Sequence, residues 1–322
     1  MEADPLIDQF VVYPKRYLIV FLFALAQFMT SCLINTLTPI ARFLEVIYDQ
    51  DPLMVNSGAL LFALMYPLFT FPAAYVIDTY GIRVGIAVGC GLCLLGTSLR
   101  MLVNSSFAWV IVGQVIAGVG RPFILNCQAK IGANWFQAEK RAGITQLLTL
   151  VLNVSLIIGL FIPGLVFGKY ELNPVTDEKL EAGRQNTFDL MMIEFILAIV
   201  CLAPNMIFMR SRPPTPPSDS AGITKREPFK IAIPKLFKNR NYVLLILAFG
   251  CYFGIFNGLS IILSFLLNPW FHENLAIAVG YVGGSPVVSG IIGVIILGPM
   301  QRKSGNFKKY IVICMLGTFE LT

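Results

Sequence analysis

Eight apolar stretches, each of membrane-spanning length, follow one another along the chain, and a ninth begins near its C-terminus. Because a hydrocarbon layer of ~30 Å needs ~20 apolar residues of helix, each stretch is predicted to be a transmembrane helix. Backbone polar groups must be paired inside lipid, so runs of this kind cross a membrane as helices. The predicted spans are residues 17–41, 54–77, 84–103, 107–129, 142–167, 188–209, 241–267 and 276–300, with another from 310 onward. The sequence therefore predicts an all-α, polytopic (multi-pass) membrane protein.

The composition and the placement of charge agree with this class. Hydrophobic residues make up 56% of the chain and charged residues 13%, whereas soluble domains carry about 25% charged residues. With the N-terminus on the cytoplasmic side, most lysines and arginines lie in cytoplasmic segments, as the positive-inside rule requires. The net charge of +6 therefore indicates membrane orientation, and no nucleic-acid partner is expected.

The first residues bear on which membrane holds the protein. The segment Glu2–Ile7 fits an acidic dileucine sorting signal, with a plain tail as the alternative. We expect the plasma membrane or an endolysosomal membrane, and another organelle membrane, including the mitochondrial inner membrane, is left open.

The sequence carries no recognisable catalytic constellation. It has one histidine, His272, and its seven cysteines all lie in predicted spans, where they behave as small hydrophobic residues. Cys90 and Cys93 have redox spacing but lack the βαβ context of that motif. No GxxxxGK[ST] loop for ATP phosphates is present. We expect no enzyme activity, no metal site and no cofactor.

The chain divides into four parts. Residues 1–14 form a cytoplasmic tail, 15–209 a bundle of six helices, 210–240 a basic, proline-rich cytoplasmic linker, and 241–322 the start of a second bundle. The end of the linker, residues 229–240, is predicted to lie as an amphipathic segment on the inner membrane surface, with a solvated tether as the alternative.

A loop motif recurs after the second and the eighth span. The first copy is Ala74-x-x-x-Asp78-Thr-Tyr-Gly81-Ile-Arg83, and the second has Arg302 in place of the acid. This motif resembles the loop signature of the major facilitator superfamily, a two-bundle transporter fold with twelve helices. Gly81 permits a tight turn, while Asp78 is expected to cap or to pair with an arginine and Arg83 to bind helix-terminal carbonyls. These three residues would latch the two bundles together.

A narrower resemblance covers almost the whole chain. It rests on Tyr13-Pro-Lys-Arg-Tyr17, Tyr66-Pro-Leu-Phe-Thr-Phe-Pro72, Ala133-Asn-Trp-Phe136 and Pro213-Pro-Thr-Pro-Pro-Ser218. These segments are similar to the feline leukaemia virus subgroup C receptor-related proteins, solute carrier family 49. The resemblance implies transport of small organic solutes such as choline, ethanolamine, haem or pyridoxine. It also implies twelve helices, of which this chain holds about nine, ending inside the ninth.

The resemblance further implies that the first, fourth and seventh spans line a central cavity. Polar residues at helical spacing on those spans are candidates for contact with substrate, with simple packing as the alternative for serine and threonine. The cavity candidates are Gln27, Ser31, Ile34 and Asn35 on the first span, Gln114 and Arg121 on the fourth, and Asn257 and Ser260 on the seventh.

Arg121 is the sharpest of these candidates. An arginine deep in a span costs ~2.5–3.5 kcal/mol even on a permissive insertion scale, so it must face an acid, carbonyls or water. No carboxylate at mid-membrane depth is evident in the sequence. We therefore expect Arg121 to grip a carboxylate or phosphate of the substrate, with a structural ion pair as the alternative.

The absence of aromatic residues at two cavity positions limits the expected class of substrate. The resemblance implies that choline-handling members cage the ammonium group between aromatic residues of the first and seventh spans. The matching positions here are Ile34 and Asn257, and Arg121 would repel a cation. Residues 35–40 and Leu99-Arg100 look more like the pyridoxine-related branch. A neutral or anionic metabolite is therefore expected.

Arg100 and Glu194 lie near the outer ends of the third and sixth spans, where mutual pairing is predicted. The pair would be structural, and the alternative is that Glu194 takes up a coupling proton.

These features together predict a secondary transporter that works by alternating access, with a small-molecule substrate and the lipid bilayer as its partners. The rival hypothesis is a non-transporting membrane subunit with the same fold and a scaffold role among membrane-protein assembly partners.

Overall fold

The structure is a computed structural model that describes residues 11–168, 170, 174–218, 229–271 and 275–304. The first ten residues, His272 and the predicted span from residue 310 lie outside the described residues. Within the described part the chain is helical throughout and has no strand, so the predicted all-α class is confirmed.

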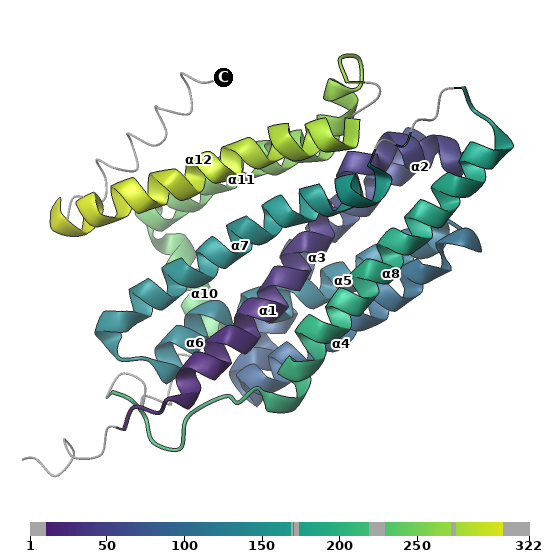
Figure 1. Cartoon of the computed structure of the whole chain (residues 1–322). Coiled ribbons are helices and arrows are strands. Elements are labelled where there is room, and N and C mark those ends of the chain that lie inside the picture. The colour runs from purple at the N-terminus through teal and green to yellow at the C-terminus, as the bar shows by residue number, and fades with distance from the viewer. Residues whose placement is uncertain (1–10, 169, 171–173, 219–228, 272–274, 305–322) are drawn as a thin grey trace, which may run out of the picture.

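The helices follow the predicted spans closely. In chain order they are α1 (Lys15–Asn35), η2 (Thr38–Ile40), α2 (Ala41–Ile47), α3 (Pro52–Tyr80), α4 (Ile82–Arg100), η3 (Met101–Asn104), α5 (Ala108–Leu125), α6 (Gln128–Trp135), α7 (Ala138–Phe167), α8 (Asp177–Phe208), α10 (Phe229–Lys238), α11 (Arg240–Leu267) and α12 (Leu275–Ser304). By length and composition, six spans among the described residues can cross a membrane, the last of them ending at Phe208. The protein is a multi-pass membrane protein (Figure 1).

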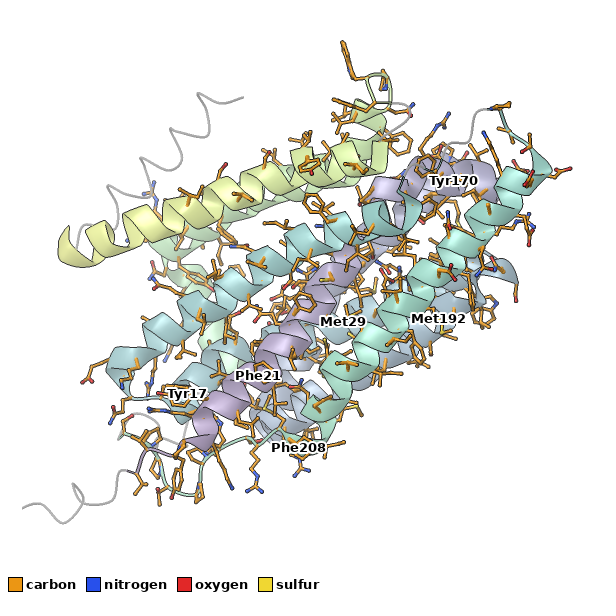
Figure 2. All side chains as sticks on the ribbon, viewed as in Figure 1. Tyr17, Phe21, Met29, Tyr170, Met192 and Phe208 are labelled. Carbon is orange, nitrogen blue, oxygen red and sulfur yellow. The ribbon has the colours of Figure 1, made fainter. Side chains whose placement is uncertain are left out.

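The bundle has two distinct ends. We call the end that carries Lys15, the turn at Gly81 and Arg210 the basic end. Figure 2 marks it with Tyr17 and Phe208, and Tyr170 marks the opposite end.

The turn between α3 and α4 depends on glycine for two reasons. Gly81 has φ +91°, which is a region that side chains with a Cβ rarely adopt. A Cβ at this position would also lie 2.8 Å from Ser211 Oγ. The predicted tight turn at Gly81 is therefore present, and α4 begins directly after it.

Glycines also set the distance between α4 and α5. A Cβ built on Gly96 would lie 2.4 Å from the carbonyl oxygen of Gly113, and one built on Gly113 would lie 2.4 Å from the carbonyl oxygen of Gly96. About two turns away along both helices, a Cβ on Gly120 would lie 2.6 Å from the carbonyl oxygen of Gly89. Small residues at these positions let the two backbones touch, as is common between membrane helices.

Helix α12 packs against α7, and α11 packs against α12. Figure 1 shows α11 and α12 side by side, with α7 next to them. The rings of Phe161 on α7 and Tyr281 on α12 meet edge to face, with their centroids 5.3 Å apart. This is one of the contacts between the six-helix bundle and the described start of the second one.

The first part of the linker is bound to the six-helix bundle. Ser211 Oγ accepts from the backbone N–H of Arg83 (3.0 Å), and the Ser211 carbonyl accepts from Asn134 Nδ2 (3.1 Å). Thr215 and Tyr13 share a hydrogen bond of 3.1 Å between their hydroxyls. Arg141 Nη2 donates to Ser218 Oγ (3.0 Å). We call residues 211–218 the strap, because these bonds hold them across the basic end.

Candidate functional site

The cavity residues predicted on α1 and α5 lie in the protein interior. Gln27, Ser31, Gln114 and Arg121 are buried, as is Ile34. Asn35 is half-buried and is the last residue of α1. Asn257 and Ser260 lie in α11, but their side chains are outside the described part of the structure.

Gln27 begins a polar network that joins three helices. Its Nε2 donates to Gln128 Oε1 on α6 (3.2 Å). Gln128 Nε2 in turn donates to the Thr145 carbonyl and to Thr149 Oγ1 on α7, each at 3.1 Å. The sequence reasoning missed Gln128 because the predicted fourth span ran on to residue 129, whereas α5 ends at Leu125.

A second network joins α3 to the end of α5. Tyr66 donates from its hydroxyl to Asn126 Oδ1 (3.1 Å), and Asn126 Nδ2 donates to Thr70 Oγ1 (3.0 Å) and to the Thr70 carbonyl (3.2 Å). Asn126 lies just past the end of α5, where Pro122 cannot supply a backbone N–H to the helix. Asn126 was also missed, and the signal that could have found it is a polar residue shortly after that proline.

These two networks border one groove. The groove has a volume of ≈ 500 Å³ and opens between α3, α5, α6 and α7. Its lining residues are Thr70, Phe71, Ala74, Leu125, Asn126, Gln128, Ala129 and Thr145. We call it the polar groove, because hydroxyl and amide groups from three helices and from the turn after α5 converge on it, and none of its lining residues carries a charge. A site of this size with a few convergent polar groups suits a small organic ligand.

Arg121 lies inside α5 and has no acidic partner among the described residues. Its side chain is buried, and its Cζ lies 5.6 Å from the centroid of the Phe62 ring, within the range of a cation–π contact. No described carboxylate comes within 4.0 Å of it. Its Nε is buried without a hydrogen-bond partner among the described residues. The structural ion pair that the sequence left as an alternative therefore has no described partner.

Three other predicted cavity residues also carry buried polar atoms that lack a hydrogen-bond partner among the described residues. Gln27 Oε1, Ser31 Oγ and Gln114 Oε1 have no hydrogen-bond partner in the described protein. Buried polar atoms are nearly always paired, so such atoms are where water or a ligand is needed. Gln114 also has a packing role, since its Nε2 donates to the Leu33 carbonyl of α1 (2.8 Å).

The predicted latch residues lie together at the basic end. Asp78, on the last turn of α3, forms an ion pair with Lys130 of α6. This described partner is a lysine, whereas the sequence suggested a cap or an arginine. Arg83 is exposed, and its backbone is bound by the strap residue Ser211.

Arg100 and Glu194 contact each other far from the polar groove. Arg100 Nη1 lies 2.7 Å from Glu194 Oε2, and both side chains are almost fully buried between α4 and α8. This distance is that of a direct ion pair between a guanidinium and a carboxylate. Arg100 ends a helix of 19 residues that starts at the basic end, so it lies about 27 Å from that end along the helix.

Comparisons with known proteins identify relatives of this chain. The family model of the Major Facilitator Superfamily matches residues 20–319. Solute carrier family 49 member A3 of Danio rerio is 27% identical over 315 residues, which cover 95% of this chain and 63% of that protein. The choline/ethanolamine transporter FLVCR1 of Mus musculus is 23% identical over 326 residues, covering 95% and 57%. The chain spans less than two thirds of either relative.

Solved structures show the same fold. The bacterial homolog of the human lysosomal transporter Spinster, in an inward-facing and unoccupied conformation, superposes with a TM-score of 0.65 at 16% identity. The match covers 92% of this chain and 65% of that one. The fucose:proton symporter FucP of E. coli gives a TM-score of 0.55 at 17% identity, covering 77% and 62%.

Proposed function

The chain belongs to the Major Facilitator Superfamily, and we propose on that basis that its protein is a secondary active or facilitative transporter of a small organic metabolite. Substrate would bind between two helical bundles and reach either side by rocking of one against the other. Relatives that are named as transporters favour this proposal over a non-transporting scaffold subunit.

One observation carries the proposal: a polar groove with uncharged walls, close to an arginine that no described acid neutralises. Thr70, Asn126, Gln128 and Thr145 bring hydroxyl and amide groups to the groove. Asn126 is bonded to Tyr66, which lies one turn of α3 after Phe62, the ring under Arg121. Hydroxyls, ring nitrogens and carboxylates on a substrate would find partners along this path.

The charge of the site supports a neutral or anionic cargo. A cationic substrate would meet Arg121 without a compensating carboxylate among the described residues. An anion would instead gain charge-assisted hydrogen bonds from the guanidinium. Ile34, which is aliphatic, cannot contribute to an aromatic cage around an ammonium group. The choline and ethanolamine in the name of FLVCR1 are therefore less suited to this chain than a polar, uncharged solute such as pyridoxine.

The other predicted residues have supporting roles in this proposal. Asp78 and Lys130, with the Gly81 turn, would stabilise one conformation of the basic end, while the Ser211 hydroxyl, which accepts from the N–H of Arg83, holds the start of α4. Arg100 and Glu194 would clamp α4 to α8 at the opposite end. The basic end is proposed to face the cytoplasm, with the N-terminus, by the positive-inside rule.

Uptake into vesicles that contain the purified protein tests the proposal. Pyridoxine, choline, haem and a carboxylate anion are offered in turn, and empty vesicles give the background. Uptake of a neutral or anionic solute supports the proposal, whereas uptake of choline alone contradicts the charge argument. A protein that takes up none of the four, yet folds, would favour the scaffold role.

A variant pair links uptake to the polar groove. Thr145 and Thr97 are both helical threonines whose hydroxyls donate to the carbonyl four residues earlier, each at 3.0 Å. Only Thr145 lines the groove. Thr145→Val is expected to reduce uptake, and Thr97→Val, the matched control, is expected to leave it unchanged. Equal effects of the two substitutions would remove the groove from the transport path.

A further inference from the structure

A second cavity, separate from the polar groove, lies at the basic end. It has a volume of ≈ 290 Å³ and is formed where α4 begins and α8 ends. Its lining residues are Arg83, Ile207, Phe208, Met209, Arg210 and Ser211. The first of these lies in the first turn of α4, and the last is the first residue of the strap.

The cavity has a strongly positive wall. Arg83 and Arg210 both line it, and none of its lining residues is acidic. Neither arginine has a carboxylate within 4.0 Å among the residues that the structure describes. Two guanidinium groups on one small cavity offer paired donors in the fork geometry that matches a phosphate group.

The start of α4 adds to the same potential. This helix of 19 residues has no side-chain cap and no acidic residue in its first turn, so its N-terminal partial positive charge is not neutralised by its own sequence. One first-turn amide, the N–H of Arg83, is bound by Ser211 Oγ. The strap therefore fixes the arginine of α4 beside the cavity wall.

The other wall of the cavity is apolar and faces away from the protein. Ile207 is 64% exposed and Phe208 59% exposed, at the end of a helix that is apolar enough to span a membrane. Figure 2 shows Phe208 at the end of α8. Large apolar side chains exposed beside arginines at a helix end are typical of the level where acyl chains meet headgroups.

We propose that this cavity binds the phosphate of an anionic phospholipid, with Arg83 and Arg210 on the headgroup and Ile207 and Phe208 on its acyl chains. A free phosphate offers the same oxygens but has nothing to place against the apolar wall, so a lipid fits the whole cavity better. A bound headgroup would join the start of α4 to the strap. The proposal is independent of transport, because it requires only that the basic end lies at a membrane surface.

Retention of lipid by the purified protein tests this site. The protein is placed in nanodiscs of phosphatidylcholine with and without phosphatidylserine, and co-purifying lipid is counted by native mass spectrometry. Affinity for phosphatidylserine is expected to fall ~5-fold on Arg83→Gln or Arg210→Gln and ~25-fold on both. Arg212→Gln is the matched control, since Arg212 is an exposed arginine of the strap that does not line the cavity.

Three further measurements separate the outcomes. The double variant Arg83→Lys, Arg210→Lys keeps both charges but loses the forked guanidinium groups. A loss of phosphatidylserine affinity smaller than that of the double glutamine variant supports paired contacts to the phosphate. Inorganic phosphate is also added to the protein in detergent. If it stabilises the wild type but not the double glutamine variant, the site binds phosphate, and a soluble phosphate is the ligand. The proposal is overturned if Arg212→Gln costs as much affinity as the double variant, or if neither phosphatidylserine nor phosphate binds. Unfolding temperatures in lipid-free detergent verify that each variant is folded.

Discussion

The guanidinium of Arg121 lies over the ring of Phe62, with 5.6 Å between Cζ and the ring centroid. The two residues come from different helices, α5 and α3, so the contact holds the arginine toward the side of the bundle where Tyr66, Thr70 and Asn126 interact. A charge fixed by an aromatic ring keeps its hydrogen-bonding edge available, which a carboxylate partner would not allow.

Arg121→Gln is expected to lower uptake ~10–150-fold, because a hydrogen bond to a charged group contributes about 1.5–3 kcal/mol. Arg121→Lys keeps the positive charge but loses the forked guanidinium, so its uptake should lie between that of the wild type and that of Arg121→Gln. Arg184→Gln, at an exposed arginine of α8, serves as control. Initial rates in vesicles, normalised to inserted protein, give the comparison, and unchanged uptake by Arg121→Gln would remove this residue from the site.

Asp78→Asn is expected to slow turnover more than it weakens substrate binding, because the ion pair with Lys130 stabilises one conformation at the basic end. Lys130→Gln should also slow turnover. The double variant should be slowed by less than the two single effects combined, since partners in one contact are not additive. Separate measurement of kcat and KM tests this prediction. A fall in kcat matched by an equal rise in KM would count against the latch.

Glu194→Gln leaves Arg100 buried without its counter-charge, which costs roughly 3–5 kcal/mol for a buried pair. The structural role predicts a lower unfolding temperature and partial recovery when Arg100→Leu is added. Any dependence of uptake on a proton gradient, measured per folded molecule, should be the same as in the wild type. Loss of that dependence with stability intact would instead identify Glu194 as the coupling site.

Gly113→Ala is expected to destabilise the protein by about 1–3 kcal/mol, the usual cost of overpacking, because its Cβ would lie 2.4 Å from the Gly96 carbonyl. Gly143→Ala is the matched control. Gly143 lies in α7 with nothing within 4 Å of an added Cβ, so alanine there should stabilise the helix by up to ~1 kcal/mol. Thermal unfolding in detergent measures both. A similar response of the two variants would contradict the close α4–α5 contact.

The spans were predictable because a long apolar run admits few structures in lipid, and α3 differs from its predicted span of 54–77 only by a few residues at each end. The fourth span was predicted as one crossing of residues 107–129, and Ala108–Trp135 is one candidate membrane span, but a turn divides it. The run to residue 129 is interrupted after Leu125, and α6 begins at Gln128. The interruption brings Asn126 and Gln128 to the polar groove, and hydrophobicity alone does not reveal it.

Contacts distant in sequence were harder to foresee. Tyr13 and Thr215 are bonded across 202 positions, and nothing in their spacing predicts this. The proline-rich composition of the linker indicated an extended chain but not what it would lie against. The contact between Arg100 and Glu194 was easier to predict, because two buried charges at matching depths in one bundle have few other partners. The polar residues of α1 were predicted by their helical spacing, whereas their partners on α6 and α7 depended on tertiary packing.

The glycine contacts between α4 and α5 leave no layer of side chains between those helices. Sliding requires side chains that can exchange neighbours, and carbonyls pressed against Cα atoms cannot do so. The α7–α12 contact is different, since Phe161 and Tyr281 meet there as rings. Any relative movement of the halves should therefore leave the spacing of α4 and α5 fixed and be taken up along α7. Distance measurements between spin labels on the two helix pairs would then show one rigid pair and one variable pair.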